Sequence, residues 1–147
     1  MNLPERLYIA SDHAGFSLKQ ELATALKGMG IEVVDCGTSG EASCNYTDFA
    51  HPLCHKVLAT GAFGILVCGT GIGMSMAANR HRGIRAAVCT HEFLAQATRA
   101  HNNANVLCLG SRVTGPGLAF EIARIFLTTP FEGGRHQTRI EGIEISQ

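Results

Sequence analysis

The stretch that decides the fold is Ile65-Leu66-Val67-Cys68-Gly69-Thr70-Gly71-Ile72-Gly73-Met74-Ser75-Met76-Ala77-Ala78-Asn79. An apolar run typical of a buried strand ends at Cys68, and three glycines at alternate positions lead into small residues typical of a helix. Glycines let the backbone approach a ligand closely, and the helix adds the positive end of its dipole. The stretch therefore predicts an anion site in which the same donors would stabilise a thiolate. Cys68 is the first candidate for a reactive side chain.

Two better-known glycine loops do not fit this stretch. A dinucleotide fingerprint, GxGxxG, would place its last glycine at Met74 or Met76. A Walker loop would need a Lys-Ser or Lys-Thr pair after the glycines, and no such pair follows. Taken alone, the stretch is equally compatible with a tight turn that buries an inert cysteine, because buried free cysteines are common.

Length, charge and composition narrow the class of protein. The 147 residues fit one domain, 1–147, which is long enough to bury a real core. The formal net charge is zero and 16% of the residues are charged, so we expect neither a nucleic acid nor an acidic membrane surface as a partner. Neither a secretory signal nor an apolar run of membrane-spanning length is found, and we expect a cytoplasmic protein.

The cysteines do not predict disulfides or a metal centre. Without a secretory signal a disulfide framework is not expected, and the six cysteines include no CxxC pair. His51, Cys54 and His55 lie within one predicted helix and could share a face, but no second group of ligands accompanies them. We therefore expect no metal.

Strands alternate with helices along the chain. The expected strands are 7–10, 31–35, 65–68, 84–89 and 106–110, and the longer helices between and after them are 16–29, 48–58, 91–101 and 116–127. Thr90 is expected to cap the helix that begins at residue 91. This alternation predicts an α/β fold, doubly wound and Rossmann-like, in which a five-stranded parallel sheet carries helices on both faces.

In such sheets ligands bind beyond the carboxyl ends of the strands, at the point where the strand order reverses. With the order 2-1-3-4-5, this crevice lies between the first and third strands. It would bring Asp12 and His13 beside Cys68 and Thr70. Taken alone, Asp12 and His13 are better explained as caps of the first helix.

Three further side chains are candidates for binding or acid–base chemistry. His101 ends a predicted helix, where a histidine is either a surface residue or an acid–base group that works near neutral pH. Arg135 and Arg139 are four residues apart and would share a face if that segment is helical. A shared face suits a phosphate clamp, and the alternative is a solvated helix edge.

Five motifs in order carry a resemblance to a known family: Ser11-Asp12-His13-Ala14-Gly15, Cys68-Gly69-Thr70-Gly71-Ile72-Gly73, His101-Asn102 to Asn105-Val106-Leu107, Gly110-Ser111-Arg112 and Gly133-Gly134-Arg135-His136. With them the chain resembles the type B ribose-5-phosphate isomerases, in the family shared with the galactose-6-phosphate isomerase subunits, over essentially its whole length. The resemblance implies that a phosphorylated sugar is isomerised between aldose and ketose through a cis-enediolate, without a metal or another cofactor.

The resemblance also implies roles for the residues around the glycine loop. Cys68 would be the base that moves a proton between neighbouring carbons, and Thr70 would assist proton movement between the oxygens. The backbone of residues 69–73, including Ile72, would stabilise the enediolate. In one branch of the family a glutamate just after the loop is the base, but Met74 stands there and cannot accept a proton. This chain therefore resembles the cysteine branch.

The remaining roles implied by the resemblance concern the sugar and its phosphate. His101, with Asp12 nearby, would open the sugar ring, and Asn102 would hold a sugar hydroxyl. Four side chains would bind the phosphate: His13, Arg112, Arg135 and Arg139. The resemblance further implies a homodimer or a dimer of dimers, with the site at the subunit interface and His101 or some of the arginines donated by the neighbour.

At this point the sequence leaves an alternative open for the substrate and another for the class of function. Tyr46-Thr47-Asp48 stands where many relatives have a proline after the tyrosine, which could reshape the loop that bounds the sugar. We expect ribose 5-phosphate, and a 6-phosphorylated hexose such as allose or galactose 6-phosphate is the alternative, since all present a terminal phosphate. A non-catalytic nucleotide-binding module is the alternative of another class, against which the missing nucleotide fingerprints count.

Overall fold

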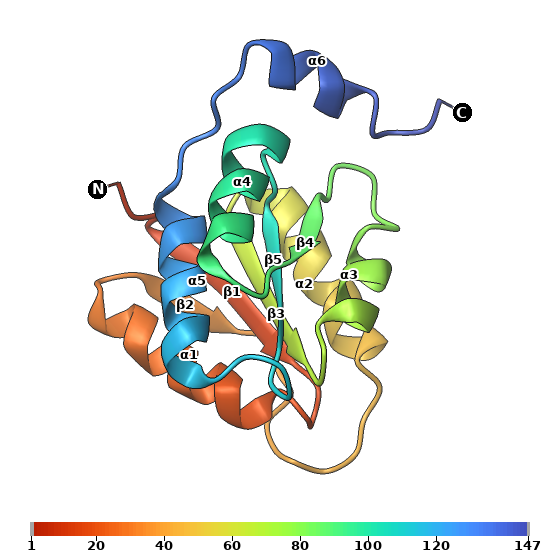
Figure 1. The fold of residues 1–147 in the computed structure, drawn as a ribbon. Coiled ribbons are helices and arrows are strands. Elements are labelled where there is room, and N and C mark those ends of the chain that lie inside the picture. Colours follow the sequence, from red (N-terminus) through yellow and green to blue (C-terminus); the bar gives the residue numbers. More distant parts are fainter. Residues whose placement is uncertain (1, 147) are drawn as a thin grey trace.

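A five-stranded parallel sheet forms the centre of the computed structural model, which describes residues 2–146 (Figure 1). Met1 and Gln147, the ends of the predicted domain, lie outside the described residues. The strands are β1 Arg6–Ser11, β2 Glu32–Asp35, β3 Phe63–Cys68, β4 Ala86–Val88 and β5 Val106–Gly110. The helices are α1 Phe16–Gly28, α2 Thr47–Thr60, α3 Ile72–Ala78, α4 Glu92–Asn102, α5 Pro116–Thr128 and α6 Arg135–Glu141.

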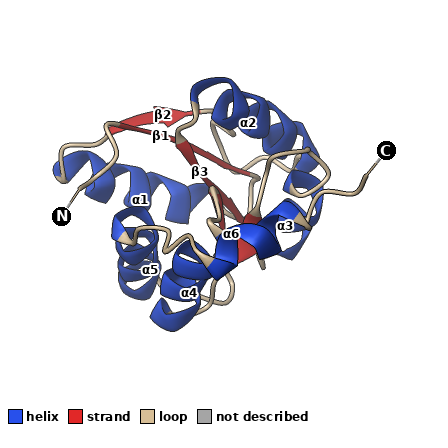
Figure 2. Ribbon diagram, turned by 90° about the horizontal axis from the view of Figure 1, so that it is seen from above, coloured by secondary structure: helices blue, strands red, loops and turns tan. Residues whose placement is uncertain are grey.

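Helices cover both faces of the sheet, as the alternation of strands and helices predicts. Helices α1, α4 and α5 pack on one face and α2 and α3 on the other (Figure 2). Successive side chains of a strand point to opposite faces, so Ile65 and Val67 belong to the first core and Leu66 and Cys68 to the second. Since both faces are buried, β3 is a continuous apolar run rather than an alternating one. The predicted doubly wound α/β fold is confirmed.

The strand order differs from the expected 2-1-3-4-5 at one edge. The observed order is β2-β1-β3-β5-β4, so β5 lies between β3 and β4. All five residues of β5 are buried, which suits an interior position, whereas β4 has three half-buried residues and forms the edge. From β1 the chain passes to β2 on one side and then returns to β3 on the other side. The strand order therefore reverses between β1 and β3, as the sequence predicts.

The edge strand is shorter than predicted, and the helix that follows it begins and ends one residue later than predicted. The side chain of Asn79 donates to the carbonyl of Ala86 at 2.9 Å and accepts from its N–H at 2.8 Å. These bonds occupy the backbone at the start of β4, whose range of 86–88 is shorter than the expected 84–89. Helix α4 has His91 as its N-cap residue, so the prediction that Thr90 caps it is wrong. Within residues 2–146, no helix combines the length and apolar character that a membrane span requires.

A buried lysine fixes the chain that leaves β2. Lys19 of α1 is completely buried, and its Nζ donates to both carboxylate oxygens of Asp35 at 2.7 and 2.9 Å and to the carbonyl of Thr38 at 2.6 Å. The same segment pairs with the end of β1, since Ser11 donates to Gly37 and Thr38 donates to Ser11. The loop that continues from here towards α2 borders the carboxyl end of β1.

Candidate active site

Cys68 is the last residue of β3, and its side chain accepts a hydrogen bond from the glycine loop. The backbone N–H of Gly71 donates to Sγ at 3.1 Å. Gly71 has φ 80°, and a Cβ there would lie 3.1 to 3.2 Å from backbone atoms of Leu109. A glycine is therefore required both for the left-handed conformation and for the close approach of β5. The loop supplies a backbone donor to the thiol of the kind that a thiolate needs.

Arg112 lies against this loop from the end of β5. Its N–H donates to the carbonyl of Gly69 at 3.0 Å, and the N–H of Ser111 donates to the carbonyl of Cys68 at 2.8 Å. A Cβ at Gly69 would lie 3.1 Å from Nη1 of Arg112. The absence of a side chain at Gly69 therefore lets the guanidinium pack directly against the loop backbone. At the other side of the loop, Oγ1 of Thr70 accepts from the N–H of Ile72 at 3.3 Å. Arg112 thus places a fixed positive charge beside Gly69, the residue that follows Cys68.

Asp12 joins the end of β1 to the same region. Its N–H donates to the carbonyl of Val67 at 3.2 Å, and Oδ1 accepts from the N–H of Gly15 at 3.0 Å. The carboxylate is buried and holds the turn that leads into α1, whose N-cap residue is Gly15. The interpretation of Asp12 and His13 as caps of α1 is wrong, because Gly15 is the N-cap residue and no side chain caps the helix. The reversal of strand order also brings Asp12 to the neighbouring strand β3, which ends at Cys68.

His13 has a defined tautomer. The backbone N–H of Cys44 donates to Nδ1 of His13 at 3.2 Å. Since this N–H can only donate, Nδ1 is the acceptor, and the proton of the neutral ring is on Nε2. The Nε2–H remains a donor that suits a phosphate oxygen. Sequence reasoning missed Cys44, whose Sγ also lies 3.8 Å from Nδ1 of His13, because the two residues are 31 positions apart and no periodicity links them.

Tyr46 packs on the far end of the glycine loop. A Cβ at Gly73 would lie 2.7 to 3.0 Å from the ring and hydroxyl of Tyr46, so the absence of a side chain at residue 73 admits the ring. Tyr46 is the N-cap residue of α2 and is 40% exposed. The loop before α2, which the sequence predicted to bound the sugar, therefore does lie beside the glycine loop.

The other candidate residues lie at the opposite end of the sheet. Helix α4 runs against the direction of the strands and ends at Asn102, and α6, which carries Arg135 and Arg139, packs beside it (Figures 1 and 2). The carbonyl of Asn105 accepts from the N–H of Gly64 at 3.0 Å, so the chain that leaves α4 lies at the beginning of β3. Gly64 and Cys68 are four residues apart on one strand, roughly 13 Å. One chain therefore does not bring His101 to Cys68.

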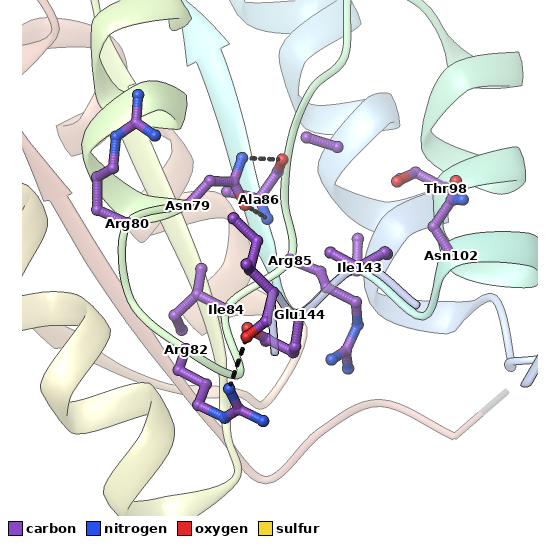
Figure 3. Close-up of a pocket in the computed structure, with 13 residues that line it drawn as sticks. Asn79, Arg80, Arg82, Ile84, Arg85, Ala86, Thr98, Asn102, Ile143 and Glu144 are labelled. Atoms are coloured by element: carbon purple, nitrogen blue, oxygen red, sulfur yellow. Dashed lines mark hydrogen bonds between the residues drawn. The ribbon is translucent and has the colours of Figure 1, made fainter. Parts of the chain in front are cut away.

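A cavity of about 700 Å³ adjoins this second group of residues (Figure 3). It is bordered by Asn102 of α4, by arginines that follow α3 and by the C-terminal segment, where Nη1 of Arg82 donates to the carbonyl of Ile145 at 3.4 Å. Its lining contains Asn102 but neither Cys68 nor the glycine loop. The cavity is thus distinct from the crevice at the carboxyl ends of the strands.

The histidines and the cysteine of α2 do not converge on one point. Cys54 is completely buried, and burial raises the pKa of its thiol to about 12. Nδ1 of His51 lies 2.7 Å from Nε2 of His81, and the ring of His55 stands edge-on to His81. Burial, and then the two neighbouring histidines, lower the pKa of His81. Among residues 2–146, the group whose ligand atoms are close enough for a metal is instead His101, Glu132 and His136.

The sequence and structure are similar to known sugar phosphate isomerases. A family described as Ribose/Galactose Isomerase matches residues 7–143. A putative sugar phosphate isomerase of Bacillus subtilis is 50% identical over 137 residues, which cover 92% of each chain. Ribose-5-phosphate isomerase B of Escherichia coli is 45% identical over 143 residues, which cover 95% of this chain and 94% of the relative.

The chain is also similar to solved structures of ribose-5-phosphate isomerases. A ribose 5-phosphate isomerase of Thermotoga maritima superposes with a TM-score of 0.93 at 51% identity, over 97% of this chain and 98% of that one. Ribose-5-phosphate isomerase B of Mycoplasma genitalium, solved with bound ribulose-5-phosphate, superposes with a TM-score of 0.91 at 43% identity, over 97% and 95% of the two chains.

Proposed function

Because the chain belongs to the ribose/galactose isomerase family, we propose that it interconverts D-ribose 5-phosphate and D-ribulose 5-phosphate. A relative that matches nearly the whole chain was solved with ribulose-5-phosphate bound. The observation that carries the proposal within this chain is the placement of Cys68, whose thiol ends the central strand β3 and accepts the N–H of Gly71.

Cys68 is proposed as the base. As a thiolate it takes the proton from C2 of the open-chain aldose, and the electron pair of that C–H bond forms the double bond of the enediolate. The thiol then returns the proton to C1, which gives the ketose. Thr70, whose Oγ1 lies at the start of the loop, carries the proton from O2 to O1. The backbone of residues 69–73 stabilises the charge that develops on oxygen.

The phosphate and ring-opening roles are divided between the two ends of the sheet. Arg112 and the Nε2–H of His13 lie at the carboxyl end with Cys68, and both are suited to an anion. His101, proposed to open the sugar ring, lies at the other end. Two further phosphate arginines, Arg135 and Arg139, are carried there by α6.

A second copy of the chain can supply to each site the residues that a single chain holds at the opposite end of the sheet. We propose that in a homodimer, alone or within a dimer of dimers, each active site combines the Cys68 loop of one subunit with His101, Asn102, Arg135 and Arg139 of the other. Asp12 of the first subunit would then meet His101 of the second. In a twofold-symmetric dimer the same contact forms twice, so both sites are completed at once.

The proposal is tested by assaying purified, metal-stripped protein for conversion of ribose 5-phosphate in the presence of EDTA. Cys68→Ala is expected to lower kcat by orders of magnitude, while Cys36→Ala, which removes a thiol away from the loop, retains activity. Full activity of Cys68→Ala would show that another group is the base. Turnover of a chelated wild-type enzyme supports the metal-free route.

The same assay separates the alternative substrates, and a melting experiment tests the alternative of a nucleotide-binding module. Turnover of allose or galactose 6-phosphate without turnover of ribose 5-phosphate would retain the family and change the substrate. For a nucleotide-binding module, nucleotides rather than sugar phosphates would raise the melting temperature, because a ligand that binds only the folded state stabilises it.

A further inference from the structure

Three side chains with metal-binding atoms meet where α4 ends. The rings of His101 and His136 are stacked, with centroids 4.4 Å apart and planes inclined by 16°. Oε2 of Glu132 lies 3.4 Å from Nε2 of His136 and 4.0 Å from Nε2 of His101. All three ligand atoms lie within 4.8 Å of one another. The proposed isomerase chemistry gives no role to Glu132 or His136.

The backbone holds this triad, His101, Glu132 and His136, in place. The N–H of Glu132 donates to the carbonyl of Ala100 at 3.0 Å, which ties the chain before α6 to the last turn of α4. Gly133 and Gly134 have φ of 66° and 56°, a conformation that favours glycine, and they turn the chain so that His136 returns beside Glu132. The side chain of His136 is 9% exposed, whereas those of His101 and Glu132 are 48% and 59% exposed. The triad is therefore supported from within and open to ions from solvent.

Two imidazoles and one carboxylate form a ligand set that zinc accepts, with the fourth position left to water. Imidazole also suits other late first-row cations such as Co²⁺. Zinc bonds to these atoms at about 2.0–2.2 Å, so tetrahedral ligand atoms lie roughly 3.3 Å apart. The distance between His136 and Glu132 already meets this value. The half-exposed ring of His101 has to turn out of its stack with His136 to complete the site, because the stacked rings are nearly parallel and the ligand atoms lie up to 4.8 Å apart.

We propose that the triad binds a divalent cation of the zinc class and that this metal reversibly inhibits the isomerase. The inhibition follows because a metal on Nε2 of His101 removes the group assigned to opening the sugar ring, so this half of the inference rests on the proposed function. Arg135 and Arg139 place positive charge on the same helix, which opposes tight retention of a cation. The metal is therefore a competitor for His101 and not a catalytic cofactor.

Metal binding is tested directly, without reference to activity. Zn²⁺ is titrated by calorimetry into metal-stripped protein of the wild type, His136→Gln, Glu132→Gln and His81→Gln. We expect one ion per chain in the wild type and in His81→Gln, which controls for histidines elsewhere. The two triad variants should bind more weakly by at least the roughly tenfold that is lost when an outer-shell partner of a metal site is removed. Glu132→Gln, at an exposed position, remains informative if His136→Gln fails to fold.

Co²⁺ then distinguishes this site from the free cysteines. The proposed site contains no sulfur, so its cobalt spectrum should show d–d bands without a thiolate charge-transfer band. Such a band, unchanged zinc affinity in both triad variants, or no zinc binding by the wild type would each overturn the assignment.

Inhibition is measured separately, as the zinc concentration that halves turnover of ribose 5-phosphate. That concentration should rise by about tenfold or more in Glu132→Gln. An unchanged value would overturn the inhibitory role while the titration still decides the metal site. If the wild-type protein does not isomerise ribose 5-phosphate at all, the proposed function fails and the titration remains valid.

Discussion

The backbone N–H of Gly71 donates to Sγ of Cys68 across 3.1 Å, and Gly71 can do so because its φ is 80°. The turn that ends β3 therefore does two things at once. It reverses the chain into α3, and it aims a backbone dipole at the only thiol that ends a central strand of the described sheet, residues 2–146. We therefore expect the reactivity proposed for this cysteine to depend on a glycine three residues away.

Gly71→Ala is expected to lower both activity and stability. A methyl group would be held in the left-handed region and pressed within 3.1 to 3.2 Å of the backbone of Leu109. Such strain costs about 1–3 kcal/mol in the free energy of unfolding, to be measured by urea denaturation. Gly117→Ala in α5 is the matched control, because a Cβ there meets nothing within 4 Å. Equal stability of the two variants would contradict the strain.

The buried cysteines should make the protein labile at high pH. Burial raises the pKa of Cys54 and Cys89 from 9.0 to about 12. Because both pKa values are higher in the folded state, the stability they contribute is complete below pH 9.0 and is lost as the pH rises towards 12. The melting temperature should therefore fall across this range.

Cys54→Ala tests the cause of this alkaline loss. The variant is less stable at every pH, because it leaves a cavity, but its melting temperature should fall less steeply between pH 9 and 12. Cys36→Ala is a weaker comparison, since this thiol is half-buried at a surface loop. A slope that Cys54→Ala leaves unchanged would show that other groups titrate.

Lys19→Met is expected to destabilise the fold by about 1–3 kcal/mol, because it removes the charged donor from the carboxylate of Asp35, which is 39% exposed and stays partly solvated. The substitution keeps the length and the apolar stem of the side chain, so packing within the core is retained. It also releases the carbonyl of Thr38, to which Nζ donates. Lys27→Met, near the exposed end of α1, should change the free energy of unfolding little. Similar losses in the two variants would contradict the role of Lys19.

The sequence predicts local structure better than the order of the sheet. The run before Cys68 and the glycines after it make β3, its turn and α3 predictable, since one apolar stretch and one turn admit few alternatives. The positions of β4 and β5 were not predictable in the same way. A crossover from β3 can reach either the adjacent place or the next one, and only the full burial of β5 against the half-buried β4 decides between them.

Candidate residues were predictable as motifs, but their neighbours were not. Thr90 has the chemistry of a cap, yet the backbone of α4 begins one residue later, with His91 as N-cap. Glu132 and His101 are 31 positions apart, and their proximity depends on how α6 packs beside α4. No periodicity in the chain encodes that packing, which is why the sequence directed attention to His51, Cys54 and His55 as possible metal ligands instead.

Subunit complementation tests whether each site is shared between two chains. Cys68→Ala and His101→Gln are expected to be nearly inactive as separate proteins. After exchange of subunits, each hybrid dimer holds one site with both groups intact and one with neither, so random mixing should restore about one quarter of wild-type activity. The gain arises without any chain that carries both residues in working form.

The matched control is a mixture of Cys68→Ala with Thr70→Ala, two residues of the same glycine loop. Each site of that hybrid lacks one of the two groups, so no activity should return. Hybrid formation is verified by tagging one variant and isolating mixed dimers. No activity in verified hybrids of Cys68→Ala and His101→Gln would place both residues in the site of one chain. Recovered activity in the control mixture would show that complementation does not report which chain supplies each residue. A site within one chain would require α4 to move from the opposite end of β3. There the carbonyl of Asn105, just after α4, accepts a hydrogen bond from the N–H of Gly64.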